Sequence, residues 1–475
     1  MDLSKHTQKI KEYFNKIASK RDYWRDKNIY YHNQIEHLCK FLIPQNKKVL
    51  DIGCGTGDLL ASLQPQYGLG IDISESLIEI AKKKHKKIKF LVNDVQSLKI
   101  NYIFDYIVMS DVIGHLDDIQ LVFNNLNKVA NERTRIVITY YNFLWEFILN
   151  IAEKIKLKMP QPTQNWLSSK DIENLLDLAD LEVVKKGHLI LLPLYIPFLS
   201  NFLNRFLARL PLLKNLSLVS YFVVRKSCSL YSDKEYSVSI IIPARNERDN
   251  IEQAIIRTPI LGKWQEFIFI EGNSKDRTAE EIKRVIKLYK GKRNISLIDQ
   301  GKGIGKADAV RKGFDKAKGD ILMILDCDLT VRPEEVLKFY QAIKIGKGEM
   351  IQGSRLVYPM EKQAMRLLNI FGNKIFGLVF SWLLDQQIKD TLCGTKVLFR
   401  EHYLQIRENR SYFGDFDPFG DYDLIFGASK LNLKIVEIPI RYQDRTYGET
   451  NISRFKHGWL LLKMTIFAAK KIKFI

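Results

Sequence analysis

The sequence predicts two α/β domains, each a doubly wound fold built on a mostly parallel sheet. At 475 residues the chain is too long for one ordinary hydrophobic core. Short β-branched runs alternate with helix-like segments in both halves, which is the pattern of parallel strands covered by helices. This pattern begins again at YSVSIIIPARNERDNI, residues 236–251, near the midpoint of the chain. We therefore expect one domain over residues 1–230 and a second over residues 231–475.

The composition is that of an ordered globular protein with an excess of basic residues. Hydrophobic residues make up 46% of the chain and charged residues 27%. Lysine and arginine number 74 against 54 aspartates and glutamates, and the formal charge of +20 favours anionic partners. Residues 183–232 contain no acid and are strongly apolar. Such a segment suits a lipid surface better than nucleic acid, and the alternative is a buried segment with solvated cations.

The sequence contains few signals of compartment. Its five cysteines are scattered without a CxxC pair, which argues against a zinc ribbon and fits free thiols in a reducing cytoplasm. The opening MDLSKHTQKIKEYF lacks the apolar stretch of a secretory signal. No uninterrupted apolar run reaches the ~18 residues of a conventional spanning helix. We expect a cytoplasmic protein.

The first half begins its sheet in KKVLDIGCGTGDLLASL, where a strand-like KVLDI precedes three alternating glycines. Gly53, Gly55 and Gly57 allow a tight turn and let a ligand approach the backbone, while a helix over residues 58–64 directs its N-terminus at that ligand. The strand segments of this half carry acids at or near their ends: Asp51, Asp72, Asp94 and Asp111. An acid after the second strand can accept hydrogen bonds from both hydroxyls of a ribose.

Together these acids and glycines resemble class I S-adenosylmethionine-dependent methyltransferases across about residues 25–226. An NAD site is the competing interpretation of a glycine run alone. The resemblance implies that Asp51 and the three glycines hold the amino-acid portion of S-adenosylmethionine, Asp72 the ribose and Asp94 the adenine environment. It also implies little catalysis beyond alignment, because a sulfonium methyl group is already a good electrophile.

The segment SDVIGHLDDI resembles the loop that faces the methyl acceptor in small-molecule members of this family. His115 is therefore a candidate base, since a neutral imidazole can take the proton of an acceptor hydroxyl. A capping or packing histidine is the alternative. The helix expected at KRDYWRDKNIYYHNQIEHL would cover the site and could supply Tyr30, Tyr31 or His32 to the acceptor pocket.

An amphipathic helix is predicted inside the acid-free stretch, between the segments LEVVKKGHLILL and LSLVSYFVVRK that read as the last two strands of the first sheet. The helix would either dock on the second domain or lie on a bilayer. Its apolar positions recur at helical spacing opposite polar ones: Leu199, Phe202, Leu203, Phe206, Leu207 and Leu210 against Asn201, Asn204, Arg205 and Arg209.

The second half repeats the alternation of strands and helices and ends one buried strand in two acids. The strand segments, some with the turn and helix that follow them, are in order VSIII, FIFIEGNSKDRTAEEI, ISLIDQ with GKGIGKADAVRKGF, and DILMILDCDLT. Asp326 and Asp328 end the last of these strands and project to the same side. Two close carboxylates repel each other unless a cation lies between them, and Mg²⁺ or Mn²⁺ there could stabilise a nucleotide diphosphate as leaving group. A chance pair of turn acids is the alternative.

In order and spacing, IPARNERDNI, IEGNSKDRT, GKGIGKADAVRKGF and LDCDLT resemble the nucleotide-sugar-binding half of family 2 glycosyltransferases with the GT-A fold. The resemblance covers residues 236–475. Within that family the second half most resembles the polyprenyl-phosphate (dolichol-phosphate) sugar transferases, on the segments GSRLVYP, DTLCGTKVLFR, IVEIPIRY and DRTYGETN. An α/β binding module without this activity is the alternative.

The resemblance implies a role for each matching position. Pro243, Arg245 and Glu247 would line the nucleoside pocket, and Glu271 would contact the base. Asp326 and Asp328 would hold the metal. Arg355 and Arg366 would contact the acceptor phosphate, and Arg445 the donor diphosphate. The chain departs from the family pattern at four positions, which leaves the identity of the nucleotide open: Arg245, Gly272, Thr330 and Asn451.

Asp421 and Asp423, in FGDYDLIF, lie where the wider family places its catalytic base. A hydroxyl acceptor needs such a base because its pKa lies far above neutral pH, whereas a phosphate acceptor is already ionised. Two direct, inverting mechanisms therefore stay open. A cap of a helix or loop is a further interpretation of Asp423.

The sequence as a whole predicts a bifunctional transferase at the cytoplasmic face of a membrane. HGWLLLKMTIFAAKKIKFI and MRLLNIFGNKIFGLVFSWLL are typical of interfacial helices rather than spans. One half would transfer a sugar, with inversion and a metal, from a nucleotide-sugar to a polyprenyl phosphate or lipid-linked glycan. The other would methylate the glycan or a related small molecule. A soluble glycosyltransferase acting on a sugar hydroxyl, with an inactive methyltransferase-like docking domain, is the alternative, and neither version involves nucleic acid.

Overall fold

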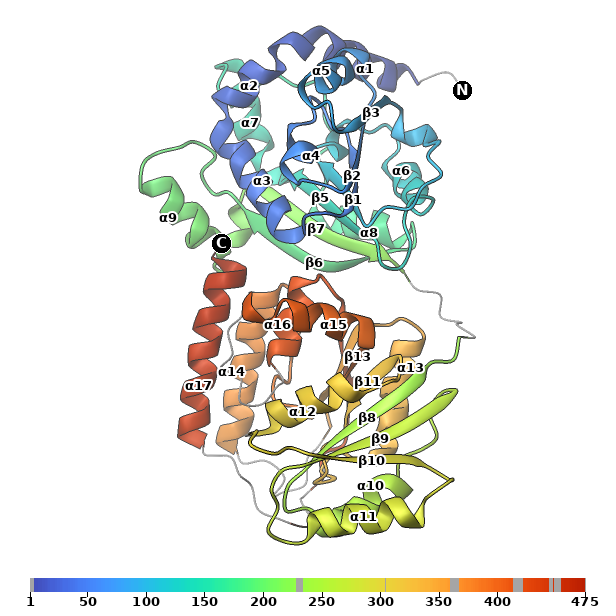
Figure 1. Cartoon of the computed structure of the whole chain (residues 1–475). Helices are drawn as coiled ribbons and strands as arrows, with labels where there is room; N and C mark the ends of the chain where they lie inside the picture. Colours follow the sequence, from blue (N-terminus) through green and yellow to red (C-terminus); the bar gives the residue numbers. More distant parts are fainter. Residues whose placement is uncertain are drawn as a thin grey trace. The chain divides into compact units, whose positions relative to one another are not determined.

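The computed structural model of the chain describes residues 4–227, 234–303, 305–358, 367–412, 422–443, 447 and 454–474, and of residues 367–371, 411 and 454–458 the backbone alone. The chain divides into two compact units, residues 1–227 with residue 474 and residues 228–473 with residue 475. Among the described residues each unit forms a seven-stranded sheet with helices around it (Figure 1). The predicted fold class is confirmed for both halves.

The sheet of unit 1 is parallel except for one strand. Its order is β3-β2-β1-β4-β5-β7-β6, with β7 antiparallel to both neighbours. The order reverses between β1 and β4, and ligands of open α/β sheets bind outside the carboxyl ends of the strands at such a point. The strands are β1 Lys48–Ile52, β2 Tyr67–Asp72, β3 Lys89–Val92, β4 Tyr106–Ser110, β5 Arg135–Tyr141, β6 Leu181–Leu189 and β7 Val219–Lys226.

Helices cover both faces of this sheet because the strand side chains alternate between two apolar cores. Leu50 of β1 packs in a cluster with Val122 of α6, whereas its neighbour Val49 packs in another with Ile35 of α3. The helices are α1 Lys5–Ile17, α2 Arg21–Lys27, α3 Ile29–Leu42, α4 Asp58–Ser62, α5 Glu75–Lys84, α6 Ile119–Leu126, α7 Glu146–Lys154, α8 Ser169–Asp177 and α9 Leu199–Arg205.

The amphipathic helix predicted over residues 199–210 is shorter in the structure. It comprises α9 and a separate 3-10 turn, Leu207–Arg209. Asn204, predicted on the solvated face, is buried instead and accepts hydrogen bonds from the backbone amides of Leu191 and Leu192 at 2.8 and 2.9 Å. The polar positions of α9 thus hold the helix to its own unit, and Phe202 is exposed.

The sheet of unit 2 has the order β10-β9-β8-β11-β13-β12-β14, with β13 antiparallel to β11 and β12. Val238 and Ile240 of β8 pack in one core with Ile282 of α11, while Ile241 faces α12, where a Cβ at Gly313 would meet it at 2.5 Å. The strands are β8 Ser237–Ala244, β9 Trp264–Glu271, β10 Asn294–Asp299, β11 Ile321–Ile324, β12 Met350–Ser354, β13 Lys396–Phe399 and β14 Ile435–Pro439.

Eight α-helices of unit 2 lie in the described residues: α10 Ile251–Ile256, α11 Thr278–Leu288, α12 Gly305–Lys316, α13 Val336–Lys344, α14 Leu367–Leu384, α15 Arg400–Glu408, α16 Tyr422–Lys430 and α17 Arg454–Ala468. α14 includes residues 367–384 and α17 includes residues 457–468 of the two segments predicted to be interfacial. Within the part of the chain that the structure describes, no helix combines the length and the apolar character needed to cross a bilayer. Trp459, Leu462 and Ile466 form an exposed apolar row along α17.

Candidate functional site

A cavity of about 500 Å³ lies in unit 1 at the carboxyl ends of the strands on either side of the β1–β4 switch point. Most residues predicted to bind S-adenosylmethionine line it, including Asp51, Gly53, Gly55, Asp72 and Asp94. The carboxyl ends of parallel strands meet at one edge of a sheet, which is why acids from separate strands come together here.

Gly57 does not line this cavity. It precedes α4 in the left-handed conformation, at φ 81°, and a Cβ on it would lie 2.6 Å from the ring of Phe90. Glycine at position 57 is therefore required by the turn and by the packing of Phe90, because a larger residue would be strained at this positive φ and would clash with the Phe90 ring. Gly55 also has a positive φ, 53°, but only the Arg21 side chain lies within 4.0 Å of an added Cβ. Of the two glycines, Gly55 leaves room for a ligand.

Asp51 is buried beside Asp72, and its Oδ2 has no hydrogen-bond partner among the described residues. Burial and the neighbouring Asp72 raise the pKa of Asp51 to about 8. Asp72 accepts hydrogen bonds from the amides of Gly55 at 2.9 Å and Ser74 at 3.0 Å. A buried carboxyl oxygen without a partner suits a cationic ligand group such as the ammonium of an amino acid.

His115 lines the same cavity from the turn after β4. Its Nε2 lies 3.3 Å from Nε2 of Gln164, and its ring packs edge-on against Phe14. Burial lowers the pKa of His115 to about 4, so the imidazole is neutral at physiological pH. The position and the neutral state fit the predicted base, while the contact with Phe14 fits the packing interpretation.

Tyr31 and His32 line the cavity, but Tyr30 does not. The Tyr30 hydroxyl lies 3.3 Å from Asn201 and accepts a hydrogen bond from Asn204 at 3.1 Å. Tyr31 therefore fits the predicted pocket, and Tyr30 instead ties α3 to α9.

A polar cluster around Asp111 also faces the cavity, and the sequence assigned it no role. Asp111 accepts hydrogen bonds from Tyr31 at 2.6 Å and Thr139 at 3.2 Å. Its backbone has φ 56°, a strained conformation for a residue with a side chain. Burial raises the pKa of the Asp111 carboxyl. The position of Asp111 directly after the fourth strand could have predicted this, because the acids at or near the ends of the other strands were assigned to the ligand-binding edge of the sheet.

In unit 2 the two predicted metal ligands follow β11. Oδ1 of Asp326 lies 2.7 Å from the Lys306 ammonium, and Asp328 accepts hydrogen bonds from Thr330. Although burial raises the pKa of Asp326, Lys306 holds it below its ordinary value. A Cβ at Gly394 would lie 2.1 Å from Asp326, so only glycine permits this approach.

The carboxylate pair is chemically suitable for Mg²⁺ or Mn²⁺, which prefer oxygen ligands. In the described residues no group of three or more His, Cys, Asp or Glu side chains gathers for a metal. At Mg²⁺ sites on nucleotide phosphates, water and substrate oxygens usually supply ligands beside one or two carboxylates.

The residues predicted for the nucleoside lie at the carboxyl ends of β8 and β9. Pro243 is in β8, Arg245 follows it and is exposed, and Glu247 is buried and accepts a hydrogen bond from Asn250 at 2.7 Å. Glu271 ends β9 and accepts hydrogen bonds from the amides of residues 273 and 274 at 3.2 and 2.6 Å. Glu271 thus fixes the turn that follows it, and its contact with a base remains a prediction.

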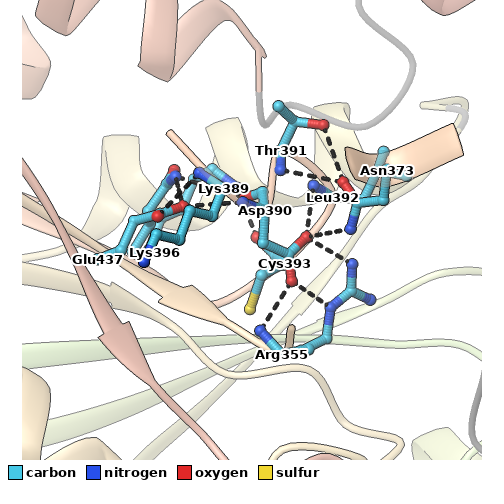
Figure 2. Close-up of polar contacts among 10 residues, drawn as sticks. Arg355, Asn373, Lys389, Asp390, Thr391, Leu392, Cys393, Lys396 and Glu437 are labelled. Carbon is cyan, nitrogen blue, oxygen red and sulfur yellow. Dashed lines mark hydrogen bonds and ion pairs between the residues drawn. The ribbon is translucent and has the colours of Figure 1, made fainter. Parts of the chain in front are cut away.

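Arg355 is held by a buried ion pair (Figure 2). Its Nε and Nη2 donate to Asp390 at 2.7 and 2.8 Å, and its backbone amide donates to the same carboxylate at 2.9 Å. Asn373 of α14 donates to Asp390 as well. Because the edge formed by Nε and Nη2 is occupied by Asp390, an acceptor phosphate could meet only the rest of the guanidinium, and that role stays a prediction.

Asp423 of α16 is buried between two arginines. Its Oδ2 lies 3.0 Å from Nη2 of Arg311 and 3.3 Å from Nε of Arg410. Burial raises the pKa of Asp423, and the two cations oppose that shift. A carboxylate placed this way resembles a structural ion pair more than an accessible base. Three other predicted site residues lie outside the described residues: Asp421, Arg366 and Arg445.

Comparison with protein families assigns each half of the chain. The model described as "Methyltransferase domain" matches residues 23–186, and the model described as "Glycosyl transferase family 2" matches residues 239–407. Dolichol-phosphate mannosyltransferase of Pyrococcus furiosus is 36% identical over 45% of this chain and 59% of its own length. Undecaprenyl-phosphate 4-deoxy-4-formamido-L-arabinose transferase of Edwardsiella ictaluri is 24% identical over 46% and 64%. The chain thus covers less than two thirds of either relative.

Two solved structures are also similar to parts of the chain. Magnesium protoporphyrin IX methyltransferase of Synechocystis, with bound SAM, is 16% identical over 48% of this chain and 100% of its own, with a TM-score of 0.34. Glucosyl-3-phosphoglycerate synthase of Mycobacterium tuberculosis, with Mn²⁺ and uridine diphosphate, is 17% identical over 50% and 80%, with a TM-score of 0.37. The family matches confirm both resemblances: the chain contains a methyltransferase domain and a family 2 glycosyltransferase domain.

Proposed function

We propose that the chain is a bifunctional transferase, with methylation in residues 1–230 and sugar transfer in residues 231–475. The second domain would transfer a sugar from a nucleotide-sugar to a polyprenyl phosphate or lipid-linked glycan, and the first would methylate that glycan or a related small molecule. The names of the relatives, which are dolichol- and undecaprenyl-phosphate sugar transferases, support this substrate class. The observation that carries the proposal is the carboxylate pair Asp326 and Asp328 at the end of β11.

In unit 1, Asp51 and Asp72 would hold S-adenosylmethionine. The unpartnered Asp51 suits the ammonium of the amino-acid portion, and Asp72 keeps acceptor capacity for ribose hydroxyls beyond its two backbone contacts. The bound cofactor would supply an electrophilic methyl group, so the protein needs to align the acceptor and exclude water. His115, neutral and on the cavity wall, is placed to take a proton from an acceptor hydroxyl.

In unit 2, Asp326 and Asp328 would hold Mg²⁺ or Mn²⁺, which would supply charge for the leaving diphosphate. Lys306, beside Asp326, is placed to contact the same phosphates. Pro243, Arg245, Glu247 and Arg445 would surround the donor, as the family resemblance implies.

The surroundings of Asp423 favour a phosphate acceptor over a hydroxyl. A general base must reach the acceptor and take up a proton, yet Asp423 is buried and bound to Arg311 and Arg410. A phosphate monoester is already ionised and needs no base. Arg355 and Arg366 would then meet it, the former through its unoccupied edge.

A lipid-linked acceptor would bring the protein to a membrane surface, and we propose the cytoplasmic face. The exposed row Trp459, Leu462 and Ile466 on α17 supports this, as does Lys463, whose ammonium lies 5.6 Å from the Trp459 ring. Aromatic and basic side chains together are typical of helices that lie in a headgroup region.

Sugar transfer to a short polyprenyl phosphate tests the proposal. UDP- and GDP-sugars would be supplied with Mn²⁺ to the wild type, Asp328→Ala and, as a matched control in the same unit, Asp299→Ala. We expect transfer by the wild type and the control, and loss in Asp328→Ala and with EDTA. Transfer that survives both EDTA and Asp328→Ala would show that the metal assignment is wrong. Transfer to a soluble sugar alone would overturn the lipid acceptor.

A further inference from the structure

Two segments that supply wall residues to the unit 1 cavity also carry many exposed apolar side chains. One part comes from the turn before α7, from α7 and from the residues after it. The other comes from the segment that leads into α9 and from the residues that follow α9. We call this set the apolar rim. Its members are Phe143, Leu144, Phe147, Ile148, Ile151, Ile155, Leu157, Leu194, Tyr195, Ile196, Phe198 and Leu212.

The rim and the cavity share residues. Ile148, Leu157 and Leu194 are on the cavity wall and exposed at the same time. The two parts of the rim are joined behind it, because Trp145 donates to the carbonyl of Leu216 at 2.9 Å and Asn142 to that of Asn215 at 2.8 Å. The rim therefore adjoins the cavity wall at Ile148, Leu157 and Leu194.

Exposure in the rim is unusually high for large apolar residues. The exposed fraction is 73% for Phe147, 91% for Phe198 and 90% for Leu212. Phe198 also has φ 62°, a conformation that costs free energy in a residue with a side chain. Single exposed apolar residues are common on proteins, but a patch of them beside a cavity marks an interaction surface.

The charges around the rim indicate its partner. Lys154, Lys156 and Arg205 are exposed beside it, whereas residues 190–217 contain no acid and residues 143–157 expose only Glu146. Apolar side chains flanked by cations match the acyl chains and headgroups of an anionic bilayer. A protein partner would more often be met by a patch depleted in lysine.

We propose that the apolar rim is a docking surface for an anionic lipid bilayer, which it brings beside the unit 1 cavity. This inference rests on the proposed methyltransferase function and narrows it, since a methyl acceptor anchored in the bilayer could enter the cavity without leaving the lipid surface. Phe147 and Ile151 of α7 insert among acyl chains, and Lys154 and Lys156 meet anionic headgroups.

A local probe separates this surface from α17 in the other unit. Asn150 of α7 and Asn174 of α8 are both exposed, and the four cysteines that the structure describes are buried. In a Cys228→Ser background, the full chain would be labelled at Asn150→Cys or, as the matched control, Asn174→Cys with an environment-sensitive dye. Vesicles of phosphatidylcholine, with or without phosphatidylglycerol and carrying a lipid-chain quencher, would then be added.

We expect the dye at position 150 to shift to the blue and to be quenched by phosphatidylglycerol vesicles, while the dye at 174 does not respond. In the same labelled chain, Phe147→Ser with Ile151→Ser should weaken the response roughly tenfold or more, and Leu178→Ser should leave it unchanged. Sedimentation of the chain with vesicles while the dye at 150 stays silent would overturn the proposal. So would a blue shift that needs no vesicles and grows with protein concentration, because the rim would then bind a second copy.

Calorimetry of S-adenosylmethionine binding on the same samples keeps this inference apart from the proposed function. Unchanged binding in the rim variants, with loss of the vesicle response, supports the docking surface. Absence of binding in the wild type would refute the proposed methyltransferase function whatever the vesicles show.

Discussion

Breaking the buried pair between Arg355 and Asp390 should destabilise unit 2 by several kcal/mol. The Asp390 carboxylate is fully buried and accepts from Arg355, Asn373 and the amide of Leu392, at 2.7–3.1 Å. In Asp390→Asn the side chain keeps its size, but an amide nitrogen replaces one oxygen and faces donors. The guanidinium of Arg355 is then left buried without a counter-charge (Figure 2).

Two lines of reasoning give the magnitude. Removing one partner of a buried ion pair costs about 3–5 kcal/mol. Independently, the Arg355 guanidinium outweighs the opposing effect of burial and lowers the pKa of Asp390 from 3.8 to about 2. At about 1.4 kcal/mol per unit, this shift corresponds to roughly 2.5 kcal/mol. We expect a loss of about 2–5 kcal/mol at neutral pH.

The effect should depend on pH with a definite sign. Because the pKa of Asp390 is lower in the folded state than in the unfolded one, its contribution is complete above the unfolded value near 3.8 and is lost as pH falls toward about 2. The difference between wild type and Asp390→Asn should therefore shrink across that interval.

Differential scanning calorimetry of the full chain provides the measurement. S-adenosylmethionine should raise the transition of unit 1, which identifies the other transition as that of unit 2. For a unit of this size we expect Asp390→Asn to lower that transition by roughly 10 °C. The matched control is Glu334→Gln, which breaks a paired contact with Arg257 at 2.8 and 3.0 Å on the surface and should cost at most about 1 kcal/mol. Equal effects of the two substitutions would refute the reasoning.

Four further predictions concern the two sites. The pKa of Asp51 is raised to about 8, so Asp51 should release a proton when a ligand ammonium binds beside it, and the affinity for S-adenosylmethionine should rise roughly tenfold per pH unit up to about pH 8. Calorimetry in buffers of different ionisation enthalpy measures this proton release, and Asp51→Asn should abolish the pH dependence of the affinity. If His115 is the base, methyl transfer should fall as pH drops through about 4, and His115→Gln should remove that decline while leaving cofactor affinity intact. Lys306→Ala should tighten Mn²⁺ binding several-fold in the donor-free protein, measured by electron paramagnetic resonance, since no ammonium then competes for Asp326; weaker binding would contradict this. Asp423→Asn should keep most transfer to a phosphate acceptor, and a loss beyond about a hundredfold with folding intact would restore the base assignment.

Much of the fold could be predicted because its signals are local. Alternation of apolar runs with helix-like segments placed the strands, and the restart at residue 236 separated the two halves. Asp51, Asp72 and Asp94 could be grouped from their positions in the sequence alone, since parallel strands end at one edge of their sheet. The prediction of the helix over residues 199–210 was poorer because its local signal was ambiguous. Apolar residues at helical spacing could not show that Asn204 would accept hydrogen bonds from the backbone of residues 191 and 192, or that the helix would be shorter.

The sequence by itself determined which acids lie at or near strand ends, where glycines allow close approach, and that basic and apolar residues occur together without acids. Only the tertiary structure decided how those side chains are used. Asp423 meets Arg311 across 112 positions, Arg355 meets Asp390 across 35, and Gly57 faces the Phe90 ring rather than the cavity. The physical reason is that strand and turn preferences depend on a few neighbouring residues, whereas burial and charge pairing depend on every element packed around a group. Whether a carboxylate acts as a base, a metal ligand or a structural ion-pair partner is therefore decided only by its neighbours in space.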